Sequence, residues 1–215
     1  MAYHLIFDLD GTLIDSAPDF HTSLDNLLQK YKLPTISLNE AREYIGNGFR
    51  GFVERFYESP NEELRLKLYQ EFLEIYELNF LQATKPYDGA FEYIRGSQYK
   101  TSICTNKPGK FAEPTLEHYE ILHHSWVGLV YGDTFPRAKP HPQGIEHLIH
   151  LSDIEKENTF FIGDGLPDAL AAKNADVKFI GVDFGYHPPE ELIRWGAIDI
   201  MSSFQDLDSI IQKHI

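Results

Sequence analysis

Short apolar runs alternate with amphipathic stretches along the chain after residue 85. The runs are rich in β-forming residues and are too short for typical helices. Between them, residues 142–151 and 167–175 repeat apolar positions at helical spacing. Strands that alternate with helices favour a parallel sheet covered on both faces. The predicted strands lie within 4–10, 101–106, 127–133, 159–164 and 178–183, with a short last strand at 199–203.

Residues 16–84 follow a different pattern. Apolar residues recur there at helical spacing, and no stretch has the character of a convincing strand. We therefore predict an α/β fold with two parts. A Rossmann-like parallel sheet core is formed by residues 1–15 and 85–215, and it carries an all-helical domain inserted at 16–84.

Charge and composition narrow the classes of partner. The 33 acidic residues exceed the 19 basic ones and give a net charge of −14, which opposes binding to nucleic acid or to an anionic membrane surface. No apolar run is long enough to span a bilayer, and the first residues lack the features of a signal peptide. The single cysteine, Cys104, lies in a predicted strand and is typical of a core residue. We expect a cytoplasmic protein, either a monomer or a homodimer.

Polar side chains follow several of the predicted strands at their carboxyl ends. Because the carboxyl ends of parallel strands meet at one edge of a sheet, we expect these side chains to lie together. Lys139, on the loop after 127–133, belongs to the same edge. The residues at the strand ends are Asp8 and Asp10, then Thr105, Asn106 and Lys107, then Asp164 with Asp168 four residues later.

Electrostatics limit what such an edge can hold. Two carboxylates about 4 Å apart repel by roughly 4 kcal/mol at an effective dielectric of 20. Asp8, Asp10 and Asp164 would protonate or separate unless a cation lay among them. Oxygen ligands suit Mg²⁺, and a metal with nearby lysines forms a positive site in an acidic protein. The predicted partner is therefore a small phosphorylated metabolite.

Four sequence motifs occur in an order that resembles the haloacid dehalogenase superfamily of phosphohydrolases. They are "DLDGT", "TN", a lysine in "RAKP" and "GDGLPD", and the helical insertion matches that family's small C1 cap. The wording "IGNG", "TNKP" and "GDTFPRAKPHP" is most similar to phosphoglycolate phosphatases. This resemblance implies a Mg²⁺-dependent phosphatase that hydrolyses a small phosphomonoester through an aspartyl-phosphate, with 2-phosphoglycolate as the leading candidate.

The resemblance also implies a role for each matching residue. Asp8 would attack phosphorus, Asp10 would act as acid and then base, and Lys139 would neutralise charge on the transferring group. The cap would close over the substrate. The implied catalytic residues are Asp8, Asp10, Thr105 and Lys139, the implied substrate-binding residues are Gly11, Asn106, Gly48 and Arg50, and the implied metal site contains Asp8, Asp164, the Asp10 carbonyl and, in support, Asp168.

Several of these residues have structural alternatives. Thr105 and Asn106 could cap the next helix, and Asp168 could complement a helix dipole. Lys107 is equally consistent with a solvated surface lysine. The family commonly has Ser or Thr after the metal-binding aspartate, where this chain has Gly165.

Alternative functions remain open at this point. A sugar-phosphate mutase resembling β-phosphoglucomutase would share both aspartates and a similar cap. A non-catalytic phospho-acceptor or binding protein would also gather carboxylates, a threonine and a lysine at a sheet edge. The ten histidines lack the cysteine or acidic partners of a zinc site, and we interpret them as ordinary surface residues.

Overall fold

The computed structural model describes residues 2–45 and 62–215. Gly48 and Arg50, two residues implied in substrate binding, lie outside this described part. The chain divides into a sheet unit, residues 1–14 and 86–215, and a helical unit, residues 15–85. The short strands β2 (Ile14–Asp15) and β3 (Lys85–Pro86) lie where the chain passes between the units, and they pair with each other.

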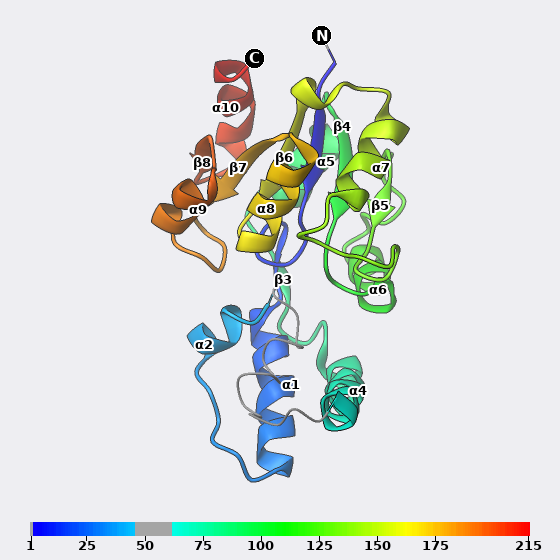
Figure 1. Cartoon of the computed structure of the whole chain (residues 1–215), viewed down its shortest axis with the longest axis vertical. Helices are drawn as coiled ribbons and strands as arrows, with labels where there is room; N and C mark the ends of the chain where they lie inside the picture. Colours follow the sequence, from blue (N-terminus) through cyan, green and yellow to red (C-terminus); the bar gives the residue numbers. More distant parts are fainter. Residues whose placement is uncertain (1, 46–61) are drawn as a thin grey trace. The chain divides into compact units, whose positions relative to one another are not determined.

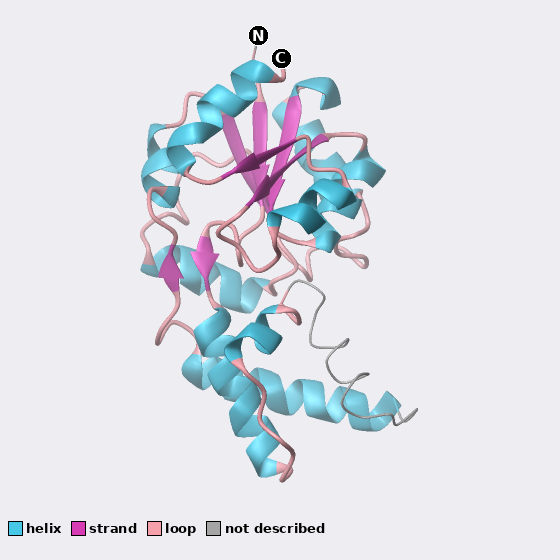
Figure 2. Ribbon diagram, turned by 90° about the vertical axis from the view of Figure 1, so that its left-hand side faces the viewer, coloured by secondary structure: helices cyan, strands magenta, loops and turns pink. Residues whose placement is uncertain are grey.

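The sheet unit contains six strands in the order β5-β4-β1-β6-β7-β8, and every neighbouring pair is parallel. Figure 1 labels the elements, and Figure 2 shows helices on both sides of the strands. The predicted α/β fold with a parallel sheet is confirmed. The strands are β1 (His4–Phe7), β4 (Lys100–Cys104), β5 (Leu129–Val130), β6 (Thr159–Gly163), β7 (Lys178–Val182) and β8 (Asp199–Met201).

Alternating side chains of the central strand build two separate cores. Leu5 and Phe7 face one core, and Ile6 faces the other. Both faces are apolar, which explains why β1 is a continuous hydrophobic run. The first core is covered by α5 (Ala90–Gly96), α6 (Gly109–His118) and α10 (Leu207–Lys213), and the second by α7 (Gln143–Ser152), α8 (Leu166–Ala175) and α9 (Pro189–Trp195).

The edge strand β5 is shorter than the sequence predicts. Only Leu129 and Val130 of the predicted strand 127–133 are in β5, because this edge strand has a single neighbour and the chain turns directly after it. The turn is held by a hydrogen bond from Tyr131 N to Thr134 Oγ1. The last helix of the sheet unit, α10, is preceded by a short 3₁₀ helix at Phe204–Asp206.

The helical unit contains α1 (Ala17–Lys30), α2 (Leu38–Arg42) and α4 (Glu62–Asn79) within its described residues. The Phe20 ring on α1 packs against Phe72 and Tyr76 on α4. Buried Asp19 accepts hydrogen bonds from the backbone N–H groups of residues 83 and 84, so the start of α1 is joined to the end of the unit. No helix in the described ranges is long and apolar enough to cross a membrane.

The strand order places the segments that follow β1 and β6, which contain Asp8 and Asp164, side by side. The chain runs from β1 to β4 and β5 on one side, and then returns to β6 on the other side of β1. Phe7 of β1 is level with Ile162 of β6, so Asp8 and Asp164 follow neighbouring strands at one edge. Ligands of open α/β sheets bind where the strand order reverses in this way.

Candidate active site

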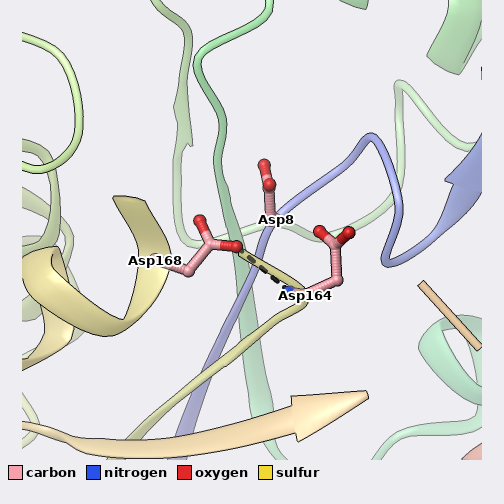
Figure 3. A group of neighbouring side chains, drawn as sticks. All are labelled: Asp8, Asp164 and Asp168. Carbon is pink, nitrogen blue, oxygen red and sulfur yellow. Dashed lines mark hydrogen bonds between the residues drawn. The ribbon is translucent and has the colours of Figure 1, made fainter. Parts of the chain in front are cut away.

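Three buried carboxylates converge beyond β1 and β6. Asp8 follows β1, Asp164 follows β6, and Asp168 lies in the first turn of α8. One oxygen from each lies within 4.8 Å of the others, and Figure 3 shows the three carboxyl groups gathered at the strand ends. Within the ranges that the structure describes, they are the one cluster of acidic, histidine or cysteine side chains arranged to hold a metal ion.

Lys139 joins two of these carboxylates. Its Nζ lies 2.8 Å from Asp8 Oδ1 and 2.6 Å from Asp168 Oδ1, and its side chain is buried. Burial alone would lower the pKa of Lys139, but the carboxylates of Asp168 and Asp8 outweigh burial and raise it. The lysine is therefore a fixed positive charge between two carboxylates.

One lysine does not neutralise the cluster. Burial, reinforced by the Asp168 carboxylate, raises the pKa of Asp8 to about 7, although Lys139 opposes the shift. Burial and the carboxylates of Asp168 and Asp8 likewise raise the pKa of Asp164. Oxygen donors that are reluctant to ionise together are the donor set that a hard divalent cation would stabilise. The residues present therefore fit Mg²⁺.

Asp168 has both of its oxygens engaged. Oδ1 accepts from Lys139, and Oδ2 accepts from the backbone N–H groups of Asp164 and Gly165, at 3.1 and 3.0 Å. Asp168 lies in the first turn of α8, where it can complement the helix dipole, as the alternative interpretation proposed. Its hydrogen bonds also orient the backbone of Asp164 and Gly165. Figure 3 shows the hydrogen bond from the Asp164 backbone to Asp168.

Lys107 belongs to the site, and its interpretation as a solvated surface lysine is wrong. Its side chain is 5% exposed, and Nζ lies 3.0 Å from Asp10 Oδ1. The partners are far apart in sequence, so their pairing depends on β1 and β4 being neighbours. Each of the two predicted catalytic aspartates therefore has its own lysine.

Thr105 and Asn106 shape the loop after β4. Thr105 is buried, and its Oγ1 accepts a hydrogen bond from the backbone N–H of Lys107 at 3.1 Å. Asn106 Nδ2 donates to the carbonyl of Lys139 at 3.0 Å. Neither caps the next helix, because the N-cap of α6 is Pro108 and no side chain caps it. The capping alternative is wrong for both residues.

Gly11 makes a turn that only glycine adopts readily. Its φ is +80°, and an added Cβ would lie 2.2 Å from Asp164 Oδ2. The family resemblance implies that Gly11 lies beside the bound substrate. In the structure, a side chain at this position would first meet the Asp164 carboxylate.

The loop after β7 also contacts the site, and the sequence prediction missed it. Tyr186 N donates to Asp164 Oδ2 at 2.8 Å, and His187 Nδ1 lies 3.1 Å from the Asp164 carbonyl oxygen. The rule that identified the other residues applies here as well, because the loop follows the carboxyl end of a parallel strand. "DFGYH" was overlooked because it has the composition of an ordinary turn.

Cys104 behaves as a core residue, as predicted. It is buried, and burial raises the pKa of its thiol to about 12. The thiol therefore stays protonated at neutral pH and is a poor nucleophile.

Comparison with known proteins relates this chain to hydrolases and phosphatases. A family model described as haloacid dehalogenase-like hydrolase matches residues 5–182. A phosphoglycolate phosphatase from Vibrio cholerae is 31% identical over an alignment that covers 87% of each chain. An N-acetylmuramic acid 6-phosphate phosphatase from Pseudomonas aeruginosa is also 31% identical, with 97% of this chain and 94% of that protein covered.

Solved structures share the fold over almost the whole chain. The crystal structure of a predicted phosphoglycolate phosphatase from Haemophilus somnus has a TM-score of 0.86 and 26% identity, and covers 97% of each chain. The similarity therefore extends through both the sheet unit and the helical unit.

Proposed function

Because this chain belongs to the family of haloacid dehalogenase-like hydrolases and is a phosphatase, we propose that it is Mg²⁺-dependent and acts on a small phosphomonoester. The leading candidate substrate is 2-phosphoglycolate. The observation that supports this proposal most strongly is the cluster of Asp8, Asp164 and Asp168 around Lys139. Its buried negative charge would be stabilised by a bound divalent cation, and Lys139 beside that cation would attract a phosphate group.

The side chains of Asp8 and Asp164 and the carbonyl of Asp10 would hold the metal. Asp168 supports them through the hydrogen bonds that its two oxygens accept, as outer residues of metal sites do. When bound, Mg²⁺ supplies charge stabilisation for the phosphoryl oxygens.

Catalysis proceeds in two displacements. A carboxylate oxygen of Asp8 attacks phosphorus while the bond from phosphorus to the ester oxygen breaks, and Asp10 donates a proton to the departing oxygen. An aspartyl-phosphate on Asp8 results. Water then attacks the phosphorus while the bond from the Asp8 oxygen to phosphorus breaks, and Asp10 accepts a proton from the water. Inorganic phosphate is released and the Asp8 carboxylate is regenerated.

Other residues bind the phosphoryl group and orient the acid. Lys139 neutralises charge on the transferring group, and the Thr105 hydroxyl and Asn106 amide bind phosphoryl oxygens. Lys107 holds the Asp10 carboxylate in one position through its ion pair. Gly11 allows the chain to turn beside the phosphate.

The names of the relatives guide the choice of substrate. Phosphoglycolate and N-acetylmuramic acid 6-phosphate are both phosphomonoesters of organic acids. A carboxylate-bearing substrate favours a cation near its second charged group. Arg50 is predicted to supply this cation and Gly48 to contact the substrate, and both stay predictions because they lie outside the described residues.

A substrate panel tests this function. Release of inorganic phosphate is measured for 2-phosphoglycolate, N-acetylmuramic acid 6-phosphate, glucose 6-phosphate and β-glucose 1-phosphate, with Mg²⁺ and with EDTA. We expect the highest kcat/KM for 2-phosphoglycolate and no turnover in EDTA. Turnover that is indifferent to the chelator would refute metal dependence. Conversion of β-glucose 1-phosphate to an isomer without phosphate release would instead indicate a mutase.

The covalent intermediate has its own test. Borohydride reduces an acyl phosphate, so quenching the enzyme during turnover should convert Asp8 to homoserine, which mass spectrometry of the peptide detects. Asp8→Asn should give no homoserine and no turnover. If reduction occurred at another carboxylate and not at Asp8, that other residue would be the nucleophile.

A further inference from the structure

The loop between β7 and α9 packs directly against Asp164. Tyr186 N binds the Asp164 carboxylate, and Gly185 approaches so closely that an added Cβ would lie 2.3 Å from Asp164 Cβ. The same Cβ would lie 2.7 Å from the carbonyl oxygen of Gly11. The loop is therefore part of the wall that surrounds the Asp164 side chain.

His187 adds a contact of a different kind, to the backbone of Asp164. Its Nδ1 lies 3.1 Å from the Asp164 carbonyl oxygen. A carbonyl oxygen can only accept, so Nδ1 must carry the hydrogen and donate it. The ring is half-buried and packs edge-on against Trp195 of α9, with 5.2 Å between ring centroids and 71° between planes. This packing fixes the direction in which Nδ1 points.

The peptide group between Asp164 and Gly165 is consequently held at both of its polar atoms. Its carbonyl oxygen accepts from His187, and its N–H donates to Asp168 Oδ2. The two partners come from different elements, the loop before α9 and the first turn of α8. A peptide group bound on both sides cannot rotate without breaking one of these hydrogen bonds.

Gly165 makes this restraint necessary. Glycine lacks the side chain that limits backbone rotation, so the peptide group before it is easier to turn than it would be before serine or threonine. An added Cβ at Gly165 would lie 3.7 Å from His187 Cε1, so the imidazole already occupies the neighbouring space. The ring therefore lies where it can restrain the peptide that a larger residue would otherwise restrain.

We propose that His187 is a positioning residue for Asp164, which holds the Asp164–Gly165 peptide so that the Asp164 carboxylate faces the cation site. The proposal rests on the proposed function, since it assumes that Asp164 binds Mg²⁺. His187 acts through the backbone of Asp164 and does not touch substrate. Outer contacts of this kind typically change metal affinity by about 10- to 100-fold.

Two substitutions separate the hydrogen bond from the ring packing. His187→Phe keeps an aromatic ring against Trp195 but removes the donor. His187→Asn loses the ring but places an amide N–H near the position of Nδ1. His150, an exposed histidine of α7, is changed to Phe as the matched control.

Mg²⁺ binding to the substrate-free protein is measured by titration calorimetry, together with kcat and KM at saturating Mg²⁺ and the metal-free Tm. We expect His187→Phe to weaken Mg²⁺ binding about 10-fold, with KM and metal-free Tm close to wild type. His187→Asn should recover most of the affinity, and His150→Phe should match wild type.

Two results would overturn the positioning role. One is wild-type Mg²⁺ affinity in His187→Phe, and the other is a larger loss in His187→Asn than in His187→Phe, which would assign the effect to ring packing. Absence of Mg²⁺ binding by the wild-type protein is a separate outcome. It would refute the proposed metal dependence itself, and the role of His187 with it.

Discussion

Lys107 Nζ lies 3.0 Å from Asp10 Oδ1, so the proposed acid–base residue is joined to a buried lysine on the neighbouring strand's loop. Lys139 makes the equivalent contact with Asp8 at 2.8 Å. The two aspartates lie two residues apart in the sequence, yet each is oriented by a different lysine. This arrangement keeps the two carboxyl groups in separate environments, which suits groups with different roles.

Replacing Lys107 should impair catalysis more than binding. In Lys107→Met, Asp10 loses the ion pair that orients its carboxylate, so we expect kcat to fall about 10- to 100-fold while KM changes less. The exposed Lys110 on the same segment provides the control, because Lys110→Met removes the same charge away from Asp10. Steady-state kinetics on the best substrate give kcat and KM for both variants. Equal kcat values for Lys107→Met and Lys110→Met would contradict the role of Lys107.

Metal-free stability should depend on pH through Asp8. The folded protein raises the pKa of Asp8 from 3.8 to about 7, so between these values the folded state holds a proton that the unfolded state has lost. The stability contributed by protonated Asp8 is present below about pH 4 and is lost as the pH rises through 7. Asp8→Asn cannot ionise and escapes this loss.

Thermal melts in EDTA measure this difference. At pH 8 we expect Asp8→Asn to melt about 3 °C or more above wild type, and at pH 4.5 we expect the gap to shrink. Mg²⁺ should raise the Tm of wild type but not of Asp8→Asn. The exposed Asp88→Asn removes one charge outside the cluster and should show neither effect. A pH-independent gap would show that Asp8 ionisation is not the cause.

A methyl group at Gly185 should disturb the metal site. An added Cβ would meet Asp164 Cβ at 2.3 Å, so the loop or the carboxylate must move. We expect Gly185→Ala to need about 10-fold more Mg²⁺ for half-maximal activity. Gly96→Ala is the matched control, because nothing lies within 4 Å of its added Cβ. Unchanged Mg²⁺ dependence in Gly185→Ala would mean that the loop adapts without moving Asp164.

The stability of the helical unit should depend on the Asp19 carboxylate. Its buried carboxylate accepts hydrogen bonds from Ala83 N, Thr84 N and Thr84 Oγ1, at 2.8, 2.8 and 2.6 Å. Asp19→Ala leaves these donors without their acceptor, and we expect a loss of about 3 kcal/mol in the free energy of unfolding. Thr22→Ala on exposed α1 surface should change it by less than about 0.5 kcal/mol.

Urea unfolding followed by two signals locates the Asp19 effect. Both tryptophans, Trp126 and Trp195, belong to the sheet unit, whereas far-UV circular dichroism reports on all helices. For Asp19→Ala we expect the circular dichroism transition to begin at lower urea than the fluorescence transition. Coincident transitions would indicate that the two units unfold together.

The parts of the fold that depend on local pattern could be predicted from the sequence. Strands β1, β6 and β7 are continuous apolar runs, and their carboxyl ends bring Asp8 and Asp164 together whatever the details of packing. Strand β5 was predicted too long because apolar character continues to Tyr131, although the backbone has already turned.

The partners of individual side chains were harder to predict. Lys107 is followed by proline and glycine, which is typical of an exposed turn. Its burial follows from its ion pair with Asp10, which lies after the neighbouring strand β1. His187 gave no signal because its contact is to a backbone carbonyl, and a carbonyl is present at every residue. Contacts of this kind depend on tertiary structure and leave little trace in a single sequence.

The pairing of β2 with β3 has a consequence for how such an enzyme changes over time. The chain leaves the sheet unit and re-enters it through two adjacent strands, so the ends of the inserted segment are neighbours. A segment with neighbouring ends can lengthen, shorten or be exchanged without altering the spacing of the strands that precede Asp8 and Asp164. Natural variation in length and sequence can therefore accumulate in the inserted segment while the sheet that positions Asp8 and Asp164 stays unchanged.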